Sequence, residues 1–148
     1  MKRTIIYFAV LIAGIIALVA GARAAEWRAI DGDTIKAVEQ IAGTKRVRTV
    51  RTVRLWGIDA PETGHLAKCQ REIDLGMAAK SEVVRLLAEA RRVRIDQRTG
   101  RDKYGRELAG VIVTQKSGAR VDVGAHLIDL QLARQYLGHG PRPQWCPG

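Results

Sequence analysis

The stretch of residues 53–63 constrains this chain more than any other part of it. Its first residues favour a strand, Gly57 favours a tight turn, and Pro61 pushes Ala60 out of helical geometry. A strand must therefore end here in a short, rigid turn. The same stretch carries three charged side chains: Arg54, Asp59 and Glu62. A turn with both charge signs is able to bind a cation and a phosphate side by side.

Residues 1–24 have the pattern of a secretory signal peptide. Lys2 and Arg3 form a basic start, residues 5–20 are a nearly unbroken apolar run, and residues 22–24 form a small-x-small cleavage pattern. We expect cleavage after Ala24, so that residues 25–148 form the mature domain. The alternative is an uncleaved membrane anchor, although a run of about 16 apolar residues is shorter than the roughly 20 of a spanning helix.

The positive charge of the chain limits the classes of molecule that it is expected to bind. The full sequence of 148 residues has a formal net charge of +10 at pH 7, and it remains strongly basic without the leader. An exported basic protein usually binds a polyanion, such as nucleic acid, an anionic polysaccharide or membrane headgroups. Charge alone does not choose among these, and it also serves solubility. The length fits one domain with one core.

Two cysteines, Cys69 and Cys146, are present. In an exported protein an even count favours a disulfide. Such a bridge would tie the tail, residues 141–148, to the body and contribute about 3–4 kcal/mol in the chain-entropy model. Neither cysteine has a second cysteine or a histidine at metal-ligand spacing. The alternative, without export, is two free thiols.

The first half of the mature chain predicts strands. Residues 27–30 and 34–38 favour two strands joined by a turn at residues 31–33, and residues 40–44 favour a second turn. Residues 45–55 are rich in β-branched side chains and favour a third strand. Its valines recur every three residues, which strict alternation does not permit, so a bulge near Val50 is expected to restore the register.

The second half predicts two helices among further strands. An apolar stripe predicts a helix over residues 74–90, with Lys80, Glu82, Arg85 and Glu89 pointing away from the core. Short strands are expected at 92–95, 108–113 and 120–121, with a polar loop at 97–106. Asp122 is expected to cap a second helix to about residue 133, and residues from 138 onward form no regular structure. This order suits a small β-barrel with helices outside it.

Three separate segments supply the carboxylates and arginines that phosphodiester hydrolysis requires. A hard cation such as Ca²⁺ needs oxygen ligands, available from Asp33 and Asp59. A carboxylate such as Glu62 is able to orient or deprotonate a water. Arg54 and Arg106 are able to give bidentate donors to charge developing on phosphate oxygens.

Each of these residues also has a simpler interpretation. Asp33 would serve as a turn former, Arg54 as a solvated strand residue, and Asp59 as a turn cap. Glu62 and Arg106 would form a surface salt bridge worth about 0–1 kcal/mol. The combination in order is more specific than any one of them.

Residues 30–34 (IDGDT), 54–62 (RLWGIDAPE) and 102–106 (DKYGR) resemble, in order, the three signature segments of the staphylococcal nuclease (thermonuclease) family. The resemblance runs from about Trp27 to about Tyr136. It implies a β-rich α+β fold: a five-stranded oligonucleotide-binding (OB) barrel with two or three helices packed outside it. It also implies Ca²⁺-dependent cleavage of DNA and RNA that leaves 3′-phosphate ends.

The resemblance also implies roles for single residues. Calcium would be held by the carboxylates of Asp33 and Asp59 and the backbone carbonyl of Ala60. The phosphate would be bound by Arg54 and Arg106, and water would be activated or organised by Glu62. The remaining matched positions are Lys103 and Tyr104, which contact a terminal phosphate in the family, and Asp31, an acid that supports the metal site.

This sequence departs from the family pattern in three places. Ala60 stands where the family's best-known member has threonine, but only its carbonyl is needed. The third helix of longer members has no counterpart, and the Cys69–Cys146 bridge is able to substitute for it by pinning the tail. Tyr136, the candidate for a base-stacking aromatic beyond Tyr104, aligns only loosely with the family pattern.

The remaining chemically capable residues are expected to be structural. The position that His65 matches has no role in the family, so His65 is expected to be a surface or structural histidine, and neither His126 nor His139 pairs with a serine or cysteine at a persuasive position. The tryptophans, Trp27, Trp56 and Trp145, are expected to anchor the core or the tail rather than to stack on bases.

The sequence thus predicts an exported, periplasmic or secreted, monomeric Ca²⁺-dependent endonuclease. Its substrates would be DNA and RNA, single strands preferred, with little sequence preference. The alternatives are a catalytically silent nucleic-acid-binding module on the same barrel and an unrelated exported polyanion-binding protein.

Overall fold

The computed structural model describes residues 26–41 and 43–147, with the side chains of residues 97 and 98 left aside. The expected signal peptide, residues 1–24, lies outside the described residues. Within the described part, no helix is long and apolar enough to cross a membrane.

Three antiparallel strands begin the sheet. They are β1 (Glu26–Ala29), β2 (Thr34–Gln40) and β3 (Val47–Leu55), in the predicted places. The predicted bulge is also confirmed, because Ala37 pairs with Arg51 and Val38 pairs with Thr49, which leaves Val50 as the extra residue.

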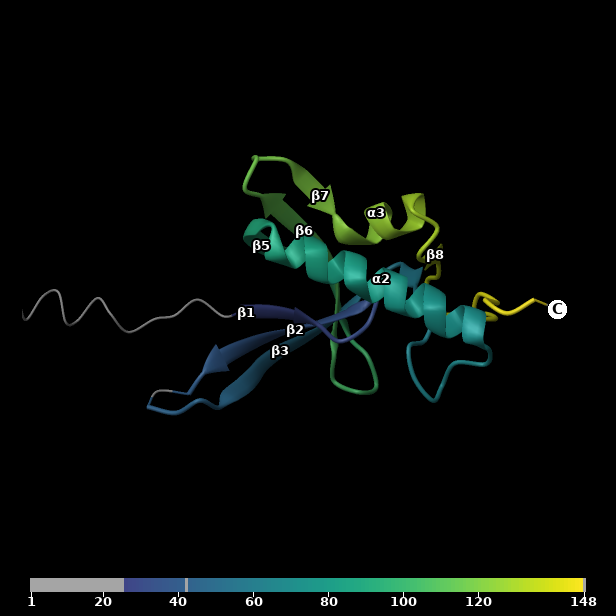
Figure 1. The fold of residues 1–148 in the computed structure, drawn as a ribbon, viewed down its shortest axis with the longest axis horizontal. Coiled ribbons are helices and arrows are strands. Elements are labelled where there is room, and N and C mark those ends of the chain that lie inside the picture. Colours follow the sequence, from purple (N-terminus) through teal and green to yellow (C-terminus); the bar gives the residue numbers. More distant parts are fainter. Residues whose placement is uncertain (1–25, 42, 148) are drawn as a thin grey trace, which may run out of the picture.

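The sheet continues through β5 (Ala90–Arg101) and β6 (Glu107–Gln115), with the short β7 (Arg120–Asp122) beside β6. Strand β6 runs parallel to β3, which joins the two halves. The prediction of a short strand at 92–95 and a loop at 97–106 was wrong. Pairing with β6 resumes at Gly100 after an irregularity, so the hairpin extends below the sheet in Figure 1 and only its tip is a turn.

Helix α2 (Gln70–Ala88) begins four residues before its predicted start. The buried carboxylate of Glu72 explains the difference, since it accepts a hydrogen bond from the backbone N–H of Lys68 at 2.7 Å and stabilises the first turn. The prediction that Glu82 points away was also wrong, because its Oε1 lies 2.6 Å from Nε2 of His126 in the second helix.

That second helix, α3 (Val123–Asp129), is capped as predicted. The Asp122 carboxylate accepts a hydrogen bond from the N–H of Ala125 at 2.9 Å. The helix ends earlier than expected, and Gln131 beyond it has a positive φ of 58°. No helix or strand follows Gln135 up to residue 147.

The two helices of the described chain cover a curled half-barrel sheet, which confirms the OB-type α+β fold. The strand order is β1-β2-β3-β6-β5, with β7 added at β6. Helix α2 crosses the sheet (Figure 1), and the core between them is formed by aliphatic side chains such as Val53, Val83, Leu86, Val111 and Leu127. A separate pair, β4 (Ile58–Asp59) and β8 (Arg134–Gln135), joins the central turn to the segment before the tail.

Candidate active site

Strand register brings the predicted site residues together. Thr34, directly after Asp33, pairs with Arg54 across β2 and β3, and the N–H of Leu55 donates to the Asp33 carbonyl at 2.7 Å. Because β6 runs parallel to β3 and begins beside it, Arg106 reaches the same end of the sheet. Three segments far apart in sequence therefore meet at one edge.

Arg54 lies between the two predicted calcium carboxylates. Its Nη1 contacts Oδ2 of Asp33, and its Nη2 lies 3.1 Å from Oδ1 of Asp59. All three residues are buried, with exposed fractions of 8%, 7% and 4% for Arg54, Asp33 and Asp59. The interpretations of Asp33 as a simple turn former and of Arg54 as a solvated strand residue were therefore wrong.

The Asp33 carboxylate is held by several donors. Its Oδ2 accepts a hydrogen bond from the N–H of Ala60 at 3.0 Å, and its Oδ1 accepts one from the hydroxyl of Thr34 at 3.1 Å. Burial raises the pKa of Asp33 to about 7, while the positive charge of Arg54 opposes this rise. A second positive charge near this buried carboxylate, in addition to Arg54, would strongly stabilise its ionised form. The turn itself is stabilised by Asp31, whose Oδ1 accepts from the Asp33 N–H at 3.0 Å.

Arg106 is oriented by the hairpin tip. Its Nε lies 2.6 Å from Oδ2 of Asp102, and its Nη1 donates to the Thr34 hydroxyl at 3.3 Å. Burial alone would raise the pKa of Asp102, but hydrogen bonds from Arg106 and from the Tyr104 backbone outweigh it and lower that pKa. The considered surface pairing of Arg106 with Glu62 does not occur, since each has another partner.

A cavity of about 380 Å³ opens among these side chains. Asp31, Asp33, Arg54, Ala60, Glu62, Tyr104 and Arg106 all line it. Asp59 is not one of the lining residues; it is buried against Arg54, which does line the cavity. Lys103 does not line this cavity, and its Nζ lies 5.1 Å from the centre of the Tyr104 ring. His65 is exposed, as predicted, and Tyr136 is not part of the lining.

Helix α2 supports the cavity wall from behind. A Cβ on Gly76 would lie 2.7 Å from the carbonyl oxygens of both Pro61 and Glu62, and a Cβ on Gly32 would lie 2.6 Å from Cβ of Ala79. Both glycines therefore permit an approach that no other residue allows. Sequence reasoning missed Gly76, although a glycine inside a helix is a signal of close packing.

Arg142, in the tail, was also missed. Its Nη1 donates to Oε1 of Glu62 at 3.2 Å, and its Nη2 lies 3.4 Å from Oδ1 of Asp59. It lines the cavity with the predicted residues. Burial would lower the pKa of Arg142, but the carboxylates of Asp59 and Glu62 raise it on balance. The available signal was a lone arginine between two prolines, four residues from a cysteine.

The donor set fits a hard cation. Within residues 26–41 and 43–147 there is no cluster of three or more His, Cys, Asp or Glu side chains able to hold a metal ion. Two carboxylates do converge on the Arg54 guanidinium, and Arg54 Nη1 touches Asp33 without the geometry of a regular hydrogen bond. Carboxylate oxygens, completed by carbonyls and water, are the ligands that Ca²⁺ takes, and Arg54 holds the carboxylates of Asp33 and Asp59 near each other.

Comparison with known proteins decides the family. Residues 52–144 match the model of the family described as staphylococcal nuclease homologue. The chain belongs to this family. No curated protein matches it.

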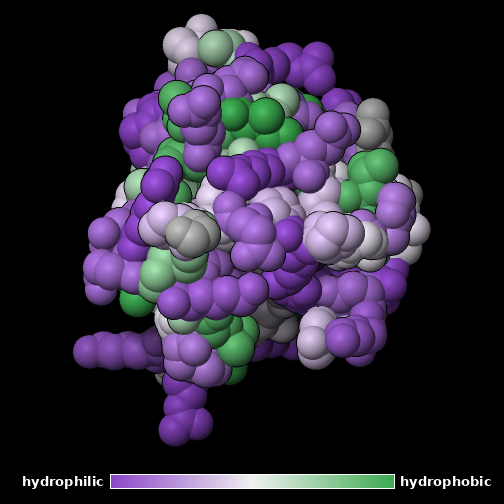
Figure 2. All heavy atoms as spheres, turned by 90° about the vertical axis from the view of Figure 1, so that its right-hand side faces the viewer, coloured by the Kyte–Doolittle hydropathy of each residue, from purple (hydrophilic) through white to green (hydrophobic). Residues whose placement is uncertain are grey.

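The family match covers Arg54, Asp59, Glu62, Arg106 and Arg142, whereas Asp33 precedes it. Asp33 therefore joins the site of this staphylococcal nuclease homologue on structural grounds, through its contacts with Arg54 and Ala60. The family domain implies binding of nucleic acid. Hydrophilic residues cover most of the face on which the tail lies, with separate apolar patches between them (Figure 2).

Proposed function

We propose that the protein is an exported Ca²⁺-dependent endonuclease that hydrolyses DNA and RNA, preferring single strands, and leaves 3′-phosphate ends. One observation carries the proposal. A buried guanidinium with two buried carboxylates stands beside a half-buried carboxylate and a second arginine at one cavity of a nuclease-family domain. The chain retains each charged group that this hydrolysis requires.

The carboxylates of Asp33 and Asp59, with the carbonyl of Ala60, would hold calcium. The ion, when bound, neutralises charge on the phosphate and favours ionisation of a nearby water. Arg54 keeps both carboxylates together in the protein without metal, which reduces the repulsion between them. It thereby keeps the site assembled before a cation binds.

Glu62 is the residue that would activate or orient the attacking water. It lies in the loop after Pro61, half-buried at the cavity wall, and its Oε1 is held by Arg142. A carboxylate in this place accepts a proton from water, or orients it, for in-line attack on phosphorus. Arg54 and Arg106 give hydrogen bonds to the phosphate oxygens that gain charge.

Tyr104 and the strands beyond it would carry the rest of the substrate. Its ring is exposed at the cavity mouth, with Lys103 and Arg106 at 5.1 and 5.4 Å from its centre. An exposed ring flanked by cations suits the stacking and phosphate contacts by which single strands bind. Backbone contacts of this kind are sequence-tolerant and weaken with salt.

Two features support export. Residues 1–24 have the signal-peptide pattern, and Cys69 and Cys146 form a disulfide with a Cα–Cα distance of 6.0 Å. Disulfides persist in oxidising compartments such as the periplasm or the exterior.

Digestion of single-stranded DNA tests the proposal. The purified protein is incubated with a labelled strand and either calcium or a chelator, alongside Glu62→Gln and Arg106→Ala. We expect digestion only with calcium and a loss of at least a hundredfold in each variant. Tight binding of the strand with no digestion would overturn the enzyme and leave the silent binding module.

A further inference from the structure

We propose that Arg142 is a third arginine of this site, a positioning residue that the disulfide-bonded tail delivers to Glu62. The inference rests on the proposed nuclease function. Among the described tail residues, 141–147, Arg142 alone lines the cavity, and its guanidinium bridges Glu62 and Asp59 at 3.2 and 3.4 Å. One planar group thus fixes the distance between the water-handling carboxylate and a metal-binding carboxylate.

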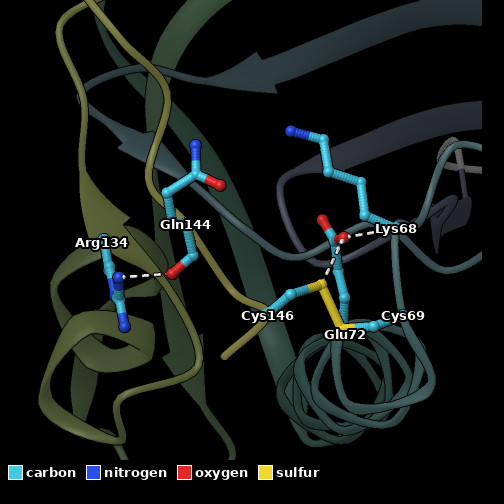
Figure 3. Close-up of a disulfide and its surroundings, with 6 residues drawn as sticks. All are labelled: Lys68, Cys69, Glu72, Arg134, Gln144 and Cys146. Carbon is cyan, nitrogen blue, oxygen red and sulfur yellow. Dashed lines mark hydrogen bonds between the residues drawn. A yellow bond between two sulfur atoms is a disulfide. The ribbon is translucent and has the colours of Figure 1, made fainter. Parts of the chain in front are cut away.

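The tail is held firmly enough to place a side chain. Cys146 is bonded to Cys69 at the start of α2, and the adjacent Trp145 is buried. Arg134 covers the Trp145 ring at 4.6 Å and donates from Nη1 to the Gln144 carbonyl at 2.8 Å. Figure 3 shows the Cys69–Cys146 disulfide on one side of the tail and the hydrogen bond from Arg134 to the Gln144 carbonyl on the other.

The start of α2 strengthens this attachment. Glu72, next to the disulfide in Figure 3, is buried with its Oε2 lying 3.8 Å from Sγ of Cys146 and 2.7 Å from the N–H of Lys68. Arg142 itself stands between Pro141 and Pro143, whose rings fix φ on both sides. The backbone that carries Arg142 is therefore restricted between an anchored segment and the cavity.

The charges explain what Arg142 adds. Without it, Glu62 would have no cationic partner among the contacts found in the described chain, and it would be free to change rotamer. A guanidinium has five N–H donors in a rigid fork, so contacts with two carboxylates leave others for an anion in the cavity. Arg142 therefore orients Glu62 and still faces the substrate.

The same contact with Asp59 has an opposite consequence for metal binding. Arg142 places positive charge beside a carboxylate that calcium would use. Removing this charge should tighten calcium binding while it slows the reaction. A tail that merely stabilises the fold would not produce these two changes in opposite directions.

Substitution of Arg142 tests the role. The variants are Arg142→Gln, Arg142→Lys and a matched control, Arg120→Gln, which removes one exposed arginine of β7. We expect kcat of Arg142→Gln to fall about 10- to 100-fold with a smaller change in KM, with partial recovery in the lysine variant. The control should stay within about twofold of the unaltered protein.

Calcium affinity supplies a readout without turnover. Titration calorimetry in the absence of nucleic acid should give a Kd for Arg142→Gln roughly twofold to fivefold lower than that of the Arg120→Gln control. If the unaltered protein digests DNA and Arg142→Gln matches the control in both kcat and calcium Kd, this role is overturned and the nuclease function stands. If the unaltered protein digests nothing under any calcium concentration, the nuclease function fails and this role fails with it.

A double-mutant cycle tests delivery by the disulfide. Cys69→Ser/Cys146→Ser should lower kcat, and Arg142→Gln should have a smaller effect in that background than in the bridged protein. An equally large effect of Arg142→Gln without the bridge would contradict delivery by the tether. Circular dichroism reports whether the serine variant folds; if it does not, the bridged Arg142 variants decide the proposal.

Discussion

Gly76 of helix α2 lies against the backbone of Glu62, so closely that a Cβ at Gly76 would stand 2.7 Å from the Glu62 carbonyl oxygen. The longest helix of the described chain therefore supports the loop that carries the water-handling carboxylate. The same helix carries Cys69 before its first turn, where the tail is attached. Helix α2 thus connects both sides of the candidate site.

This approach makes Gly76→Ala a test of the link between packing and activity. The new methyl would force the helix away from the loop, because backbone atoms cannot yield as a flexible side chain would. We expect a loss of about 1–3 kcal/mol in the free energy of unfolding, measured with urea, together with reduced digestion. Met77→Ala, at the exposed neighbouring position, is the matched control and should cost little. An unchanged Gly76→Ala protein would contradict the close approach.

The raised pKa of Asp33 should make the stability of the metal-free protein depend on pH. Its pKa in the folded protein is raised to about 7 by burial, above its ordinary value of 3.8. The folded state then binds a proton that the unfolded state has lost, so the contribution of Asp33 is full below about pH 4 and disappears as pH rises through 7. With a chelator, Tm should fall over this range, and the fall should be smaller in Asp33→Asn.

The same group makes calcium stabilisation depend on pH. Because calcium favours the ionised carboxylate, it should raise Tm more at pH 8 than at pH 5. Equal calcium shifts at both pH values, or none in the unaltered protein, would contradict the assignment of Asp33 as a ligand.

The disulfide closes a loop with a sequence separation of 77. In the chain-entropy model such a bridge contributes about 4 kcal/mol. Cys69→Ser/Cys146→Ser should therefore unfold at a lower urea concentration by about that free energy. A difference below about 1 kcal/mol would show that the tail adds little to the stability of the folded state.

Local signals in the sequence predicted most of the strands and the segments that meet at the cavity. The spacing of valines predicted the bulge at Val50, and three short motifs located the residues that meet at the cavity. These succeeded because the bulge follows from the side-chain alternation of a strand and each motif lies at a turn. Of the tryptophans expected to anchor the core or the tail, Trp145 is buried, whereas Trp56 is 36% exposed and lies outside the buried core.

The failures involve contacts between distant segments. The pairing that extends β5 to Arg101 depends on β6, and the Glu72 carboxylate that stabilises the early start of α2 is buried beside Cys146 of the tail. No local sequence pattern marks Arg142. Its position is set by the buried Trp145 and by the disulfide between Cys146 and Cys69, which are 77 positions apart. Such tertiary effects are not visible in periodicity or turn chemistry.

The most direct test of the central claim is the chemistry of the products. A defined single-stranded oligonucleotide is incubated with the protein and calcium, and the fragments are identified by mass spectrometry. The account predicts internal cleavage with 3′-phosphate ends, absent with a chelator and in Glu62→Gln. Intact oligonucleotide at saturating calcium, or cleavage that persists unchanged in Glu62→Gln, would contradict it.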